Sequence, residues 1–245
     1  MAGAPTLDLS SPAQLLTTYV HESGHAIAAT GAGDDTIALA VSGHYGGVTF
    51  IADRDPSTLS AILTGSAGFL ATALGAALVL VALAYFRTGV TAWAGLGVYV
   101  ALVGLFWVRP RSIATDAYPG EEWLTVWFVI GACIVCAAMV FLAPQMWRLV
   151  GLIVVAGLLA LGSLGEFQML GTGAGSTSDL ERLSDETGVP RAVWALVWAV
   201  TALALLVVGG IVLARTHPWT RATPDHDPGD HDPGDDTDSS SEPVL

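Results

Sequence analysis

The chain has 245 residues, of which 53% are hydrophobic and only 13% are charged. A soluble domain carries about twice that charged fraction, so the long apolar runs predict a protein that crosses a lipid bilayer several times. The basic residues are all Arg, and the net charge of −13 argues against nucleic acid as a partner.

The N-terminal segment, residues 1–11, is polar, and we expect a helix from about Pro12 to Thr30. A serine before Pro12 is a suitable helix cap, and proline is favoured at the first helical position. The helix is only moderately apolar. This composition favours a helix that its neighbours shield from lipid.

The sequence His21-Glu22-Ser23-Gly24-His25 lies on this helix and suggests a metal site. Residues four apart share one helix face, so His21 and His25 direct two imidazoles at a common point. Neutral imidazoles suit Zn²⁺, and Glu22 is placed to take a proton from a water molecule. The alternative is a non-enzymatic scaffold or transporter in which these side chains form a buried polar network or carry protons.

A β-hairpin is predicted over residues 36–52, where two β-branched runs flank a glycine-rich turn. His44 at the tip is either a metal ligand, a substrate contact or a solvated turn residue. The strand near Val48 to Phe50 offers an edge to which an extended substrate can add by β-augmentation.

Further hydrophobic segments predict an all-α polytopic membrane protein. Gly65, Gly68 and Gly75 provide small surfaces for close helix packing in the second span. Because the number of spans is six, we expect both termini on one side of the cell membrane, the cytoplasmic side. The predicted membrane domain covers residues 12–214, and residues 215–245 form an acidic, disordered tail. The predicted spans are 12–30, 62–86, 90–108, 123–143, 147–170 and 192–214.

A catalytic zinc site needs a third protein ligand besides the two histidines. Glu166 lies within an apolar run, where an unpaired carboxylate is unfavourable unless it has a function. Asp179 follows a glycine-rich loop and belongs to a capping box that predicts a helix start. Both carboxylates are therefore candidate ligands.

Four features together resemble the site-2 protease type of intramembrane zinc metalloprotease, in particular its small bacterial branch. They are HESGHA on the first helix, the hairpin SGHYGGVTF, the span TGSAGFLATALGAAL and a late Ser-Asp before the last span. The resemblance extends over roughly residues 15–208. It implies that the late aspartate, here Asp179, is the third zinc ligand, with Glu166 as the alternative.

The chain also departs from the pattern of that family. Many members have Asp-Gly where this chain has Asp179-Leu180, and the chain contains no Asn, although an asparagine often helps to bind substrate in relatives. Gln168 is the available substitute for that amide. A zinc protease that acts at the membrane surface, with a glutamate such as Glu166 as third ligand, is a further alternative.

The resemblance implies one catalytic Zn²⁺ and a membrane-anchored protein substrate, such as an anti-sigma factor. The expected reaction is hydrolysis of a peptide bond in or near a transmembrane segment, with His21, His25 and Asp179 as ligands and Glu22 as general base.

Overall fold

The computed structural model describes residues 11–42, 46–52, 57–108, 123–172 and 179–216. These residues form helices and one short antiparallel hairpin after the first helix, which confirms the predicted all-α architecture. The described elements are, in chain order, α1 (Ser11–Ala32), β1 (Thr36–Ser42), β2 (Gly46–Ile51), α2 (Thr58–Tyr85), α3 (Val90–Trp107), α5 (Leu124–Phe141), α6 (Gln145–Thr172), α7 (Asp179–Thr187) and α8 (Arg191–Thr216).

Five of the described helices, α2, α3, α5, α6 and α8, are long and apolar enough to cross a membrane. The moderately apolar α1 is not among them, which agrees with its expected place among other helices. In α2 the helix begins at Thr58, before the apolar run, because the Ser57 side chain accepts a hydrogen bond from the backbone N–H of Ser60. Hydropathy marks the apolar part of a helix and misses such a polar first turn.

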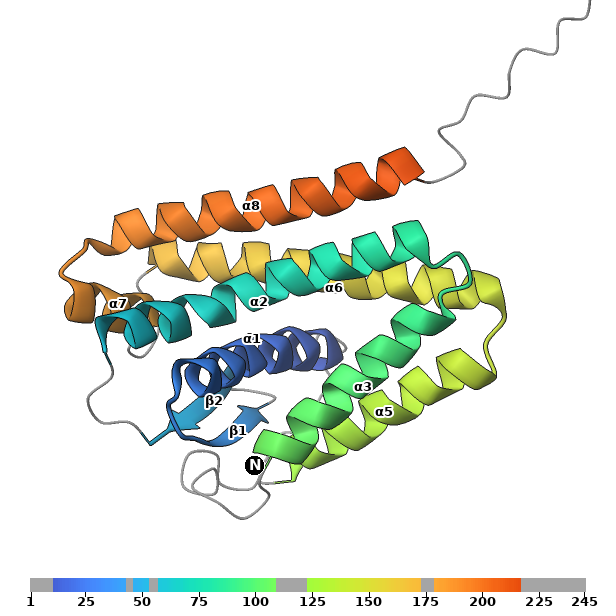
Figure 1. Cartoon of the computed structure of the whole chain (residues 1–245), viewed down its shortest axis with the longest axis horizontal. Coiled ribbons are helices and arrows are strands. Elements are labelled where there is room, and N and C mark those ends of the chain that lie inside the picture. Colours follow the sequence, from blue (N-terminus) through green and yellow to red (C-terminus); the bar gives the residue numbers. More distant parts are fainter. Residues whose placement is uncertain (1–10, 43–45, 53–56, 109–122, 173–178, 217–245) are drawn as a thin grey trace, which may run out of the picture.

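The helix α2 lies at the centre of the bundle, where it packs against α1, α6 and α8 (Figure 1). The pair α3 and α5 packs on Tyr19 of α1 in one buried cluster, and the hairpin packs against α1 around Glu22. Large apolar side chains on the outer helices are exposed, as expected for surfaces in contact with lipid.

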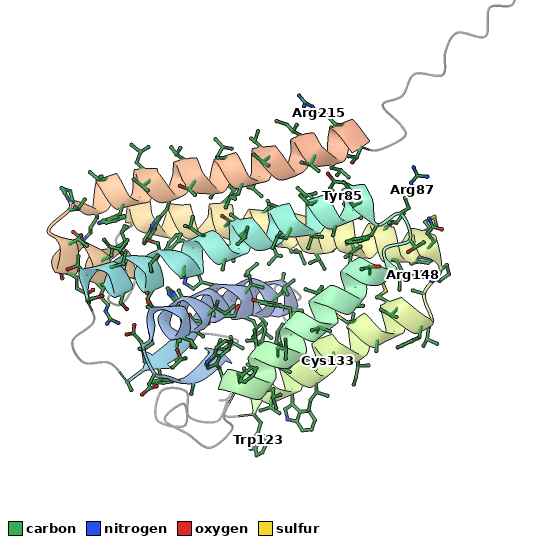
Figure 2. All side chains as sticks on the ribbon, in the orientation of Figure 1. Tyr85, Arg87, Trp123, Cys133, Arg148 and Arg215 are labelled. Carbon is green, nitrogen blue, oxygen red and sulfur yellow. The ribbon has the colours of Figure 1, made fainter. Side chains whose placement is uncertain are left out.

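Arginine and tryptophan side chains lie near the ends of the bundle (Figure 2). Arg87, Arg148 and Arg215 lie at the end away from the hairpin, whereas Trp123 lies at the start of α5, near the hairpin end. Arginine and tryptophan are both common where transmembrane helices leave the hydrocarbon. Their positions fit a bundle whose long axis crosses the bilayer.

The sheet is attached to the bundle through β1. Leu39 of β1 forms a bridge with Val108 after α3, and the backbone N–H of Val41 donates to the Thr125 hydroxyl of α5, with a distance of 2.9 Å. Leu39 and Val41 also pack with Tyr19 of α1 in one buried cluster. These contacts fix β1, and β2 then lies over α1 through its pairing with β1.

Small residues allow α1 to approach α2 closely. A Cβ added to Gly24 would lie 2.5 Å from the carbonyl oxygen of Ala67 and 2.6 Å from the Cβ of Ala71. Both distances are well inside van der Waals contact, so glycine is required here for the observed helix spacing. Because Gly24 lies between the two histidines of α1, this spacing also sets their distance from α2.

We therefore expect Gly24→Ala to lower the melting temperature of the detergent-purified protein, because overpacking destabilises by about 1–3 kcal/mol. Gly157→Ala in α6 is the matched control, since no atom lies within 4 Å of a Cβ added at that position. Equal melting temperatures for Gly24→Ala and Gly157→Ala would contradict this close packing of α1 against α2.

Candidate metal centre

The two histidines of α1 lie together on the face of the helix that packs against α2. Their ring centroids are 4.8 Å apart, and their Nε2 atoms are separated by 3.0 Å. The side chains are 14% exposed at His21 and 8% exposed at His25. The four-residue spacing in the sequence thus brings two imidazole nitrogens to one point.

The ring of His25 is oriented by the backbone of α2. Its Nδ1 lies 2.6 Å from the carbonyl oxygen of Thr64, which accepts a hydrogen bond. A neutral imidazole that donates from Nδ1 keeps its lone pair on Nε2. Metal-binding histidines use the same arrangement, in which the second ring nitrogen donates to a carbonyl or carboxylate.

The third group is Asp179, the first residue of α7. Its Oδ2 lies 3.3 Å from Nε2 of His21 and 3.1 Å from Nε2 of His25. Its side chain is 38% exposed. The structure therefore brings together residues separated by more than 150 positions in the chain.

The short helix α7 is held in place by packing against α2 and α8. Leu180 and Leu183 are buried in a cluster with Phe69 of α2 and Trp198 of α8. Phe69 stacks on Trp198 with a centroid distance of 4.3 Å and meets the ring of His21 edge-on at 5.6 Å. The same aromatic residue thus supports both α7 and one histidine.

The surroundings of Asp179 favour the charged form of its carboxyl group. Burial acts to raise its pKa, but the contacts with His21 and His25 outweigh burial and hold the pKa well below its usual range. Asp179 also lies at the N-terminal end of α7, where the helix dipole favours negative charge. A carboxylate and two imidazole nitrogens therefore face one another.

The geometry of these three atoms fits a tetrahedral metal ion. Zinc ligands at about 2.0–2.1 Å in tetrahedral geometry are separated from one another by about 3.3 Å. The separations among His21 Nε2, His25 Nε2 and Asp179 Oδ2 are 3.0, 3.1 and 3.3 Å. Two nitrogens and one oxygen also form a donor set that suits Zn²⁺ and leaves a fourth position for water or substrate.

Gly68 of α2 keeps the space beside the two histidines free. A Cβ at this position would lie 2.6 Å from Nε2 of His21 and closer still to Nε2 of His25. Any other side chain would therefore displace the imidazoles or fill the point at which they meet. The sequence predicted Gly68 as a packing residue for helices, but it did not predict this proximity to the histidines.

Glu22 is also buried, with 7% exposure, and faces the hairpin. The hydroxyl of Thr49 on β2 lies 2.7 Å from Oε2 of Glu22. No sequence pattern indicated Thr49, because the contact depends on how β2 lies over α1.

The other residues considered from the sequence are not placed by the structure. His44 lies in the hairpin turn, outside the described residues. Glu166 and Gln168 belong to the described backbone of α6, but their side chains lie outside the description. Among the described residues, the cluster of possible metal ligands consists of His21, His25 and Asp179.

Comparison with known families agrees with this geometry. A family model described as Peptidase M50B-like matches residues 4–209, which include all three residues of the cluster. The chain belongs to this family. It is therefore a multi-pass, membrane-embedded metallopeptidase of the site-2 protease type, and the resemblance seen in the sequence is confirmed. Comparisons with curated proteins and with solved structures found no match.

The role of Gly68 in this peptidase is testable by substitution. We expect Gly68→Ala to lower the bound metal of the purified protein well below that of the unaltered chain, because its methyl group would occupy the space between the imidazoles. Gly65→Ala is the control, since its Cβ would meet Leu183 at an ordinary 3.6 Å. Elemental analysis that found equal metal in both variants would contradict this geometry.

Proposed function

We propose that this peptidase hydrolyses peptide bonds in or near the transmembrane segments of membrane-anchored proteins, with one zinc ion bound by His21, His25 and Asp179. The observation that carries the proposal is the convergence of the three ligand atoms from α1 and α7 at separations of 3.0–3.3 Å. The family match supports the peptidase chemistry. The class of substrate follows from the position of these residues among membrane-spanning helices.

The proposed mechanism assigns one task to each residue. When bound, zinc supplies a Lewis acid that polarises the peptide carbonyl and makes water more acidic. Glu22 accepts a proton as water attacks the carbonyl carbon, and then gives that proton to the leaving amide nitrogen. Thr64 keeps His25 in the binding tautomer through its carbonyl oxygen.

The hairpin is the proposed binding site for the substrate backbone. A helical substrate hides its carbonyl groups in hydrogen bonds, so the segment to be cleaved must unwind and become extended. β1 is covered by contacts with Val108 and Thr125, whereas β2 pairs with β1 alone among the described strands. An extended segment can therefore add at the outer edge of β2, near Val48 to Phe50.

The orientation of the molecule is also part of the proposal. The long helices alternate in direction, and both the start of α1 and the end of α8 point toward the end of the bundle away from the hairpin (Figure 1). The start of α1 and the end of α8 therefore face the same side, and we propose that both termini lie on the cytoplasmic side of the cell membrane. Membrane-anchored signalling proteins of the anti-sigma-factor kind are the proposed substrates.

The test uses the full chain purified in detergent, with zinc content and cleavage of a membrane-anchored substrate measured together. We expect Glu22→Gln to keep its zinc and to lose about 10²–10⁴-fold in cleavage rate, because general acid and base catalysis contributes about that much. His25→Ala and Asp179→Ala should lose the zinc itself.

Three outcomes would contradict this assignment. Cleavage at the normal rate by Glu22→Gln would remove Glu22 from the mechanism. An Asp179→Ala protein that kept zinc and activity, together with a Glu166→Ala protein that lost both, would instead indicate a surface-acting protease with a glutamate ligand. A wild-type protein without zinc and without cleavage would favour a non-enzymatic scaffold or transporter.

A further inference from the structure

The side chain of Glu22 contacts Thr49 of the hairpin. The Thr49 hydroxyl lies 2.7 Å from Oε2 of Glu22 and 2.9 Å from the backbone carbonyl oxygen of the same residue. Both distances are within hydrogen-bond range. The hydroxyl has one proton and both glutamate oxygens accept, so Thr49 donates to one or the other while remaining in contact with both.

Gly47 limits the same side chain from a second direction. It lies two residues before Thr49 on β2, and alternate residues of a strand face the same side. A Cβ added to Gly47 would lie 2.7 Å from Oε1 of Glu22 and closer still to its Cγ. The backbone of β2 therefore packs directly against the glutamate, whose two carboxylate oxygens are close to different residues of the strand.

A glutamate side chain without such contacts populates several rotamers. Fixing it in one of them is unfavourable because conformational entropy is lost. A proton acceptor that is displaced by about 1 Å from its productive position can lower a rate by about 10²-fold. The hairpin removes this freedom before substrate binds. The Thr49 hydroxyl on one carboxylate oxygen and the Gly47 backbone beside the other keep the carboxylate in one orientation.

We propose that Thr49 is a positioning residue for this peptidase, whose hydroxyl fixes the Glu22 carboxylate in the orientation needed for proton transfer. The inference rests on the proposed function of Glu22 and adds a second role to the hairpin. The strand β2 then serves the reaction in two ways, since its edge is the proposed binding site for substrate and its inner face orients the base.

Kinetics of Thr49→Val test this role, because valine keeps the β-branched shape and removes only the hydroxyl. We expect kcat to fall by about 10- to 100-fold, with KM within about twofold of the wild-type value, because the carboxylate is misplaced while substrate still binds. Thr49→Ser restores the hydroxyl and should recover most of kcat. The zinc content should be that of the wild type in both variants.

Thr125→Val is the matched control, since the Thr125 hydroxyl joins α5 to Val41 of β1 and therefore anchors the hairpin by its other strand. Its kcat should fall by clearly less than that of Thr49→Val, because the Thr125 hydroxyl contacts β1 and not the Glu22 carboxylate. An equal loss in Thr125→Val and Thr49→Val would show general loosening of the hairpin and overturn the positioning role.

A second readout does not depend on activity. Melting temperatures of the wild type, Thr49→Val, Glu22→Ala and the double variant form a cycle, and contact between the two side chains predicts shifts that do not add. Additive shifts would overturn the inference, as would loss of zinc from Thr49→Val. If Glu22→Gln is inactive while Thr49→Val keeps full kcat, the positioning role is wrong and the proposed function stands.

Discussion

The structure depends on the close approach of two imidazoles of α1 and one carboxylate of α7. These polar groups lie within 3.0–3.3 Å of one another inside a bundle of apolar helices. Such groups are unfavourable in a low-dielectric interior unless they bind each other or a metal ion. Their convergence therefore requires accurate placement of α1 and α7, and much of the surrounding packing holds these two helices in position.

Different residues supply this placement from different directions. Gly24 and Gly68 allow α1 and its histidines to lie against α2, where a Cβ would collide with neighbouring atoms. Phe69 of α2 and Trp198 of α8 support α7 through the cluster that buries Leu183. The hairpin covers Glu22 and contacts it through Thr49. The candidate site is thus assembled from helix packing, the short helix α7 and a strand, and its residues are distant in sequence.

The sequence was sufficient to predict the parts that depend on local spacing. The four-residue interval between His21 and His25 determines that both lie on one helix face, and long apolar runs determine the spans. Asp179 could be chosen over Glu166 only by resemblance to a family, because neither spacing nor hydropathy determines which late carboxylate reaches α1. Thr49 could not be found at all, since its contact depends on the register of the hairpin and on the packing of β2 against α1.

The central claim is that one divalent ion is bound between α1 and α7. Anomalous scattering from crystals of the full chain, measured on both sides of the zinc absorption edge, tests it most directly. The account predicts a single zinc peak at about 2.0–2.1 Å from Nε2 of His21, Nε2 of His25 and a carboxylate oxygen of Asp179. A zinc peak elsewhere in the structure would contradict the account. A zinc peak beside the two histidines but remote from Asp179 would contradict it as well.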